Sequence, residues 1–237
     1  MLLAMWSPKG GSGTSVLAAA CAVVLARGPA GACRVADLAG DQAAIFGLAS
    51  EPELGLADWL DAGPEAPIEA LERMAVAVAP GVELLPSGEA GSSLRPRAQA
   101  EAGAALAVAL RDLEVPVVAD CGSAREPAAR AIVEVADAAV VVVRGCYLTL
   151  RRAVRSPALG CSVAAVLVDE PGRSLTRREI AEVISTPVIA RVPLRDTVAR
   201  AVDAGVLASR LPDVLGRAAM LVTARTGITP PAHGAVA

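Results

Sequence analysis

Apolar residues gather along the chain in short runs that are separated by longer, periodically apolar stretches. The short runs are nearly continuous valine, alanine and leucine without strict alternation, which is typical of strands covered on both faces. They predict strands at Leu2–Trp6, Cys33–Asp37, Val82–Pro86, Val115–Asp120, Ala138–Val143, Val163–Asp169 and Val188–Pro193.

The stretches between these runs have the spacing of amphipathic or buried helices. They predict helices at Thr14–Arg27, Leu54–Ala62, Ile68–Arg73, Pro96–Glu114, Pro127–Ala136, Leu148–Ser156, Thr176–Ile184, Thr197–Ala204 and Leu211–Ala224. Strands that alternate with helices predict the α/β class, with a mostly parallel sheet between helices on both of its faces. We expect one domain over residues 1–226 and a flexible C-terminal tail over residues 227–237.

Length and hydropathy refine this picture. The chain has 237 residues, which suits one large α/β domain. Hydrophobic residues make up 54% of it and the mean hydropathy is +0.51, yet no apolar run reaches the roughly 18 residues that span a bilayer. "MLLAMW" leads directly into a glycine loop, so it reads as a first strand rather than a signal peptide. We expect a cytoplasmic protein with at most peripheral membrane association, and a final helix that packs on the domain.

Other residue types exclude several classes of function. The five cysteines are scattered and form no C-x-x-C pair, which argues against a zinc site and a disulfide framework. The single histidine, His233, lies near the C-terminus, so histidine catalysis has no candidate. A formal charge of −3 argues against a protein that coats nucleic acid. We expect the arginines within residues 151–155 and 173–178 to be solvated helix faces rather than DNA-binding patches.

Lysine usage singles out one position. Of the 22 basic residues only Lys9 is a lysine, and it lies inside the glycine-rich segment "SPKGGSGTS". A general preference for arginine explains the composition, but not the place of the only lysine. Lys9 is therefore the first candidate functional residue.

The segment around Lys9 follows an apolar strand and opens an apolar helix, which is the setting of a phosphate-binding loop. Gly10, Gly11 and Gly13 allow the backbone to turn so that successive N–H groups face inward as an anion nest. The helix that starts near Thr14 adds the positive end of its dipole. Ser15 has the hydroxyl position that would hold Mg²⁺. The alternative is a plain glycine turn between a strand and a helix.

This loop carries a family resemblance. Lys9-Gly10-Gly11-Ser12-Gly13 matches the first five positions of K-G-G-x-G-K-[ST], and the segment resembles the deviant Walker A loop of the MinD/ParA family of P-loop ATPases. The resemblance covers nearly the whole chain. It implies the P-loop NTPase architecture of that family, ATP or ADP with Mg²⁺ as ligands, and a homodimer in which Lys9 reaches the partner's phosphates.

Further segments resemble other functional parts of the family. "VADLAGDQAAIFGL" resembles switch I, with Asp37 as a catalytic candidate, and "VPVVADCGSA" resembles the Walker B strand and switch II, which implies Asp120 on the metal side together with Ser15. "PVIARVPLRDTVARAVDAG" resembles the late strand whose following loop lies near the base, so Pro193 is a cofactor-binding candidate. Asp169 falls near the asparagine with which relatives read adenine.

Several departures from the family pattern weaken the expected chemistry. Thr14 replaces the loop lysine and removes a charged donor worth about 1.5–3 kcal/mol, so nucleotide affinity should fall about 10–100-fold while the backbone nest survives. Ala39 stands where a second switch I aspartate orients the attacking water, and Asp41 is the candidate substitute. Gly122 stands where switch II usually has proline. Together these changes predict weak binding of ATP or ADP and impaired hydrolysis.

The degraded catalytic set also bears on the branch of the family. Loops that begin "SPKGG" resemble the CpaE/TadZ branch, which helps to place and assemble Tad/Flp-type pili, and a similar group of septum-site-determining proteins. The leading hypothesis is a homodimeric localisation or assembly factor that binds pilus or division machinery. Two alternatives stay open: a working ATPase in cell division or DNA partitioning, and a scaffold that dimerises without nucleotide.

Overall fold

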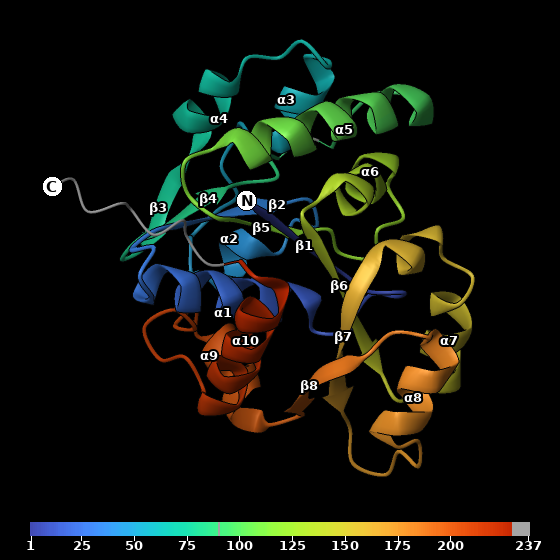
Figure 1. Cartoon of the computed structure of the whole chain (residues 1–237). Coiled ribbons are helices and arrows are strands. Elements are labelled where there is room, and N and C mark those ends of the chain that lie inside the picture. The colour runs from blue at the N-terminus through green and yellow to red at the C-terminus, as the bar shows by residue number, and fades with distance from the viewer. Residues whose placement is uncertain (90, 229–237) are drawn as a thin grey trace, which may run out of the picture.

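One twisted sheet forms the centre of the molecule, with helices on both sides of it (Figure 1). The structure is a computed structural model that describes residues 1–89 and 91–228. Within these residues the sheet has eight strands in the order β3-β4-β2-β5-β1-β6-β7-β8. The strands are β1 (Leu2–Trp6), β2 (Cys33–Asp37), β3 (Val76–Ala79), β4 (Val82–Leu85), β5 (Val117–Asp120), β6 (Ala138–Arg144), β7 (Ser162–Asp169) and β8 (Val188–Pro193).

The strands are parallel except at one edge, where β3 runs antiparallel to β4. The predicted class, α/β with a mostly parallel sheet, is confirmed. The edge strand β3 was not predicted from the sequence, because its four residues are largely half-buried and follow a helix almost directly, so no fully apolar run marks them. The other strands lie within two residues of their predicted bounds.

The helices divide into two layers that pack on opposite faces of the sheet. One face carries α1 (Thr14–Arg27), α2 (Gln42–Ile45), α9 (Asp196–Asp203) and α10 (Asp213–Thr226). The other carries α3 (Leu56–Asp61), α4 (Ile68–Met74), α5 (Pro96–Asp112), α6 (Pro127–Val135), α7 (Tyr147–Ala153), α8 (Arg177–Ile184) and the 3₁₀ turn η1 (Pro157–Cys161). Each layer closes its own apolar core against the sheet.

The predicted helices are all present with small shifts at their ends, such as Leu56–Asp61 in place of Leu54–Ala62. The short α2 and η1 were not predicted, because a helix of one turn has no periodicity to detect. As expected, α10 packs on the domain, against α1 and β8. Ile228, within the predicted tail, is buried in the same core, and the rest of that tail, with His233, lies outside the described residues. Within residues 1–89 and 91–228, no helix combines the length and apolarity needed to span a bilayer.

Strand order brings three chain segments together at one edge of the sheet. In the middle of the sheet β1 lies between β5 and β6, and β5 lies between β1 and β2. Asp120 at the end of β5 is in register with Met5 on one side and with Asp37 on the other. The loops that leave β1, β2 and β5 are therefore neighbours at the carboxyl ends of parallel strands, where α/β proteins bind ligands.

Candidate functional site

The loop between β1 and α1 has a backbone shaped by two glycines. Gly11 and Gly13 have φ angles of 73° and 80°, a region that other residues rarely adopt. The Lys9 carbonyl accepts hydrogen bonds from Ser7 Oγ at 2.8 Å and from Ser12 Oγ at 3.0 Å. Because these hydroxyls hold the loop from its inner side, its amides are left facing away from the protein.

The free amides of this loop are its main chemical feature. Within the described part of the chain, no backbone N–H group from Lys9 to Ser15 donates to a protein acceptor. The loop residues from Gly10 to Ser15 line a pocket of about 720 Å³. Successive unpaired N–H groups at the start of a helix form an anion site, so the backbone fits a phosphate group.

Asp37 and Asp120 lie behind the loop, buried without any exposed surface. Asp37 Oδ1 accepts from the N–H groups of Ala39 and Gly40 at 2.9 and 2.8 Å, and its Oδ2 accepts from the N–H of Gln42 at 2.8 Å. Burial, followed by the charge of Asp120, raises the pKa of Asp37 to about 7, against the lowering effect of these N–H donors. Burial also raises the pKa of Asp120. Asp37 therefore organises its own loop.

Gln42 connects the loop after β2 to the rest of the site. Its buried Nε2 donates both to Asp120 Oδ2 at 2.8 Å and to the carbonyl of Ser15 at 3.0 Å. The Oε1 atom of the same amide is buried without a hydrogen-bond partner in the described structure. Sequence reasoning missed Gln42, because an amide in the first turn of a four-residue helix gives no signal until the loops are folded together.

Ser15 and Asp41 place two oxygen ligands at the pocket. Ser15 Oγ donates to Asp41 Oδ2 at 3.2 Å, and both residues line the pocket. Asp120, in contrast, is not among the lining residues. Oxygen ligands of this kind suit Mg²⁺, so Ser15 and Asp41 are suited to hold the ion. Burial is the main cause that raises the pKa of Asp120, and a contact with the Ser15 side chain lowers it, so the predicted metal-side residue Asp120 lies next to Ser15.

Gly122 follows a path that proline cannot take. Its φ angle is 51°, whereas proline is restricted to values near −65°. Its N–H donates to Asp120 Oδ1 at 3.1 Å, and its carbonyl accepts from the N–H of Ser7 at 2.8 Å. The departure from proline at this position thus belongs to a different local conformation, one that ties the segment after β5 to the phosphate loop.

The fold and this geometry can be compared with solved structures. A ParA-family ATPase from Chlorobium tepidum TLS superposes with a TM-score of 0.73 at 20% identity, covering 94% of this chain and 97% of that one. The septum site-determining protein MinD complexed with Mg-ADP from Pyrococcus horikoshii OT3 gives 0.73 at 18% identity, with 94% of each chain covered. The MinC:MinD cell division complex from Aquifex aeolicus gives 0.71 at 19% identity, again with 94% of each chain covered.

The chain has the ParA/MinD fold. At identities of 20% and below, the likeness shows the fold alone. No protein-family model matches the sequence, and no curated protein matches it either. What the site can do therefore has to be argued from its own residues.

Thr14 is the first residue of α1 and stands where the motif K-G-G-x-G-K-[ST] has its second lysine. Its side chain is buried, and Oγ1 has no hydrogen-bond partner in the described structure. Among the described residues that line the pocket, Arg125 is the only cation, whereas Asp41, Glu126 and Asp203 are acidic. The lining is therefore net negative, which opposes a polyphosphate unless a divalent cation accompanies it. Sequence reasoning missed Arg125, although its place five residues after Asp120 in a Gly-Ser loop was a usable signal.

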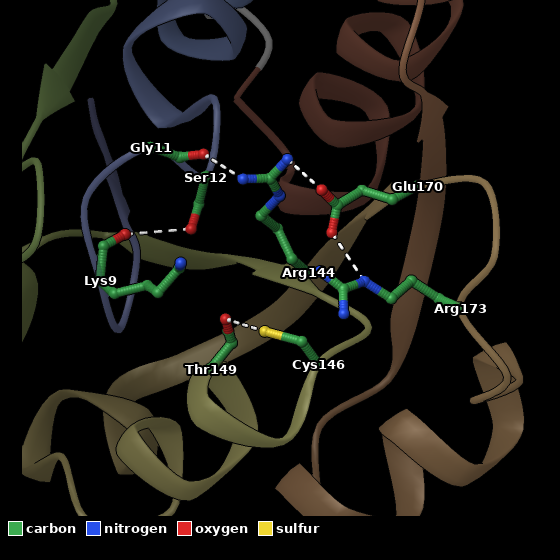
Figure 2. Close-up of polar contacts among 8 residues, drawn as sticks. All are labelled: Lys9, Gly11, Ser12, Arg144, Cys146, Thr149, Glu170 and Arg173. Atoms are coloured by element: carbon green, nitrogen blue, oxygen red, sulfur yellow. Dashed lines mark hydrogen bonds and ion pairs between the residues drawn. The ribbon is translucent and has the colours of Figure 1, made fainter.

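Lys9 does not line the pocket of its own chain. Figure 2 shows its side chain running below Ser12, on the side of the loop where Arg144 and Thr149 lie. Arg144 holds this side of the loop, because its Nη1 donates to the Gly11 carbonyl at 3.0 Å and its Nη2 pairs with Glu170. Lys9 is thus half-buried beside its own chain, and its contact with a second molecule stays a prediction.

Cys146 lies beside Lys9 at the start of α7 (Figure 2). Its Sγ is 3.1 Å from Thr149 Oγ1. Burial alone would raise the pKa of this thiol, but the hydrogen bonds with Thr149 and the charges of Lys9 and Arg173 lower it below its ordinary value. This side of the phosphate loop is therefore electropositive.

The two residues predicted to contact the base lie together but outside the pocket. Asp169 and Pro193 end β7 and β8 and are register partners. The Asp169 carboxylate pairs with Arg191, and neither Asp169 nor Pro193 lines the pocket. Their role toward a nucleotide base stays a prediction.

Proposed function

We propose that this chain is a localisation or assembly factor of the ParA/MinD type, with a degenerate site that binds ATP or ADP with Mg²⁺ weakly and hydrolyses ATP poorly. One observation carries the proposal. The amides from Gly10 to Ser15 are free of protein acceptors and line a pocket of about 720 Å³, while the lysine that would serve the same phosphates is Thr14.

The backbone supports binding and the side chains limit it. Free N–H groups and the start of α1 favour a phosphate group, and they do not depend on the lost side chain. A charge-assisted hydrogen bond contributes about 1.5–3 kcal/mol, so its loss lowers affinity about 10–100-fold. The three carboxylates in the lining, Asp41, Glu126 and Asp203, add repulsion. We expect binding to depend strongly on Mg²⁺, held by Ser15 and Asp41.

Hydrolysis should suffer more than binding. The missing lysine would have stabilised charge that develops during phosphoryl transfer, and the loss of one such group lowers rates on the order of 10²–10³-fold. In Asp37, a catalytic candidate, both carboxylate oxygens already accept hydrogen bonds from backbone N–H groups. We infer that bound nucleotide stabilises an assembled state more than it drives turnover.

An active ATPase is the second candidate, and one contact favours it. Asp41 lines the pocket with its carboxylate 3.2 Å from Ser15 Oγ, so it has a position from which it could hold a water molecule. The third candidate, a scaffold without nucleotide, is supported by the hydrogen bond with which Gln42 caps Asp120 at 2.8 Å.

The fold neighbours and the sequence resemblance support the proposed biological role. The neighbours include a cell division complex and a putative plasmid partition protein. The resemblance of "SPKGG" to the CpaE/TadZ branch favours assembly of Tad/Flp-type pili. A pilus role predicts that adjacent genes encode a secretion ATPase or a pilin, and a neighbourhood without them would remove that role.

Thr14→Lys tests the degenerate site. Restoring the charged donor should strengthen Mg·ATP binding about 10–100-fold and raise the hydrolysis rate. Calorimetric titration and a steady-state phosphate-release assay measure the two effects, with Thr14→Met as the control for side-chain size. If the wild type already turns over like an ordinary ATPase and Thr14→Lys changes nothing, the active-ATPase candidate replaces the proposal. If neither protein binds, the scaffold candidate does.

A further inference from the structure

A second hollow lies next to the phosphate loop and shares residues 123–125 with the nucleotide pocket. It has a volume of about 320 Å³ and is bounded by the end of β1, the segment after β5, α6, and the C-terminal end of α7 with the turn that follows. Four arginines line it: Arg125, Arg130, Arg152 and Arg155. We call this hollow the arginine pocket.

The arginines of this pocket are nearly without counter-charges. Within the described residues, no carboxylate lies within 4.0 Å of Arg125, Arg152 or Arg155. Arg130 has only a long contact with Glu134, at 3.9 Å. Among residues 1–89 and 91–228, none of those that line the pocket is acidic. Some arginines elsewhere in the chain are paired more closely, as Arg34 is with Glu83 at 2.8 Å.

This concentration of positive charge is local. The whole chain carries a formal charge of −3, so general basicity does not explain it. Like charges that converge on one hollow repel one another, and an anion that enters between them removes the repulsion. Guanidinium groups also present planar forks of N–H donors that match the oxygens of a phosphate group.

The shape of the pocket limits the size of its ligand. Its other lining residues include Trp6, Pro8, Ala124 and Pro157, which give it apolar walls, and its volume lies at the low end of the range for small-molecule sites. Ala124 adopts a φ angle of 47°, an uncommon value for a residue with a side chain, where the shared wall bends between the two pockets. A compact group fits this hollow better than an extended polymer.

We propose that the arginine pocket binds a small soluble molecule through a phosphate or pyrophosphate group. The site is separate from the nest of the phosphate loop, since its charged ligands come from α6, α7 and the segments that follow β5 and α7. It does not depend on nucleotide binding at the loop.

Trp6 provides an indirect signal for the test, because its side chain is fully buried beside the pocket and responds to changes in the pocket wall. It lines the arginine pocket, and the only other tryptophan, Trp59, can be replaced by phenylalanine. In this Trp59→Phe background, pyrophosphate without Mg²⁺ is titrated while tryptophan fluorescence and heat are recorded. The wild-type pocket should give a saturable change in Trp6 fluorescence.

Two charge-matched double variants decide whether the arginine pocket is the site. Arg152→Gln with Arg155→Gln removes two of its cations, and we expect pyrophosphate affinity measured through Trp6 to fall at least about tenfold. Arg151→Gln with Arg195→Gln removes the same charge from exposed positions outside the pocket and should change the affinity less than about twofold. Pyrophosphate bound at the phosphate loop would remain as heat in both variants.

Three outcomes would overturn the proposal. They are a wild-type protein whose Trp6 signal does not respond, an equal loss in both double variants, and a response to a hexaglutamate peptide but not to pyrophosphate. The last would assign the pocket to an acidic protein segment instead. Failure of ADP to bind, with the Trp6 response intact, would remove the proposed nucleotide function and leave the arginine pocket standing.

Discussion

At the scale of single residues, the loop between β1 and α1 keeps its backbone chemistry and changes its side-chain chemistry. The glycines at 11 and 13 hold the amides free, whereas Thr14 offers a buried hydroxyl in place of an ammonium group. The remaining positive charge in the lining comes from Arg125, on a different segment. The cation of this lining therefore lies on the loop after β5 and not at the start of α1.

Arg125→Gln tests whether this arginine serves the nucleotide pocket. Because Arg125 is exposed, its contribution is smaller than that of a buried cation, and we expect Mg·ADP affinity to fall about 3–10-fold. Calorimetric titration measures the change. Arg151→Gln, which removes an exposed arginine outside this pocket, is the matched control, and equal losses in both variants would count against a specific role for Arg125.

Asp37 predicts a pH dependence of stability. Its pKa is raised from 3.8 to about 7 in the folded chain, so between these values the folded state binds more protons than the unfolded state. The free energy of unfolding should therefore decrease as pH rises through this window, by at most about 1.4 kcal/mol per pH unit.

Thermal unfolding in EDTA at a series of pH values measures this effect. The wild-type Tm should fall from about pH 5 to about pH 8, in the direction that a raised carboxyl pKa requires. Asp37→Asn cannot ionise, so its Tm should change less over the same range. An identical slope for both proteins would mean that Asp37 is not the group responsible.

The site residues that could be predicted from the sequence are those that belong to one short motif. Lys9, Gly11, Gly13 and Thr14 could be singled out because the motif fixes their spacing around a strand and a helix. Gln42 and the arginine pocket could not, because their contacts join segments far apart in the chain that meet only when the sheet is formed.

At the scale of helices and strands, the pattern of apolar residues predicted the bounds of an element wherever that element buries a whole face. The predicted bounds of β1, β2, β8 and α1 are identical to the observed ones. The pattern failed for β3, since a four-residue strand at the sheet edge that is only partly buried leaves little apolar signal. It also failed for α2, whose single turn depends on the loop that Asp37 organises.

Helix packing gives a prediction with opposite signs at two helical glycines. A Cβ at Gly103 of α5 would lie 2.5 Å from Cα and 2.7 Å from the carbonyl oxygen of Ala128 on α6, so Gly103→Ala forces two helices apart. We expect it to lower the free energy of unfolding by about 1–3 kcal/mol. At Gly216 of α10 the nearest atom is Leu211 Cδ2 at 3.6 Å, an ordinary contact.

Gly216→Ala should therefore gain up to about 1 kcal/mol from the better helix propensity of alanine. Urea unfolding midpoints compare the two variants with the wild type. If Gly103→Ala is as stable as Gly216→Ala, the close packing of α5 on α6 is not as tight as described.

At the scale of the whole molecule, the role proposed for Lys9 requires an assembly of two chains. The proposed homodimer would join two phosphate loops face to face, with each Lys9 reaching the ligand of the other chain. Lys9→Ala should then reduce the dimer fraction in the presence of Mg·ATP, because it removes a charged contact across the seam.

Light scattering coupled to gel filtration measures the mass with and without Mg·ATP. Arg210→Ala, which removes an exposed cation from the face that carries α9 and α10, is the control. A mass that is the same for the wild type and Lys9→Ala under both conditions would argue against a seam at this loop.

The position of the two apolar cores bears on which amino-acid substitutions such a protein tolerates. No residue from 7 to 15 belongs to either core. Thr14 itself is buried, so a substitution there acts on the local packing at the start of α1 rather than on either apolar core. A fold whose apolar cores lie apart from its loop can change the chemistry of that loop while it keeps the arrangement of its sheet and helices.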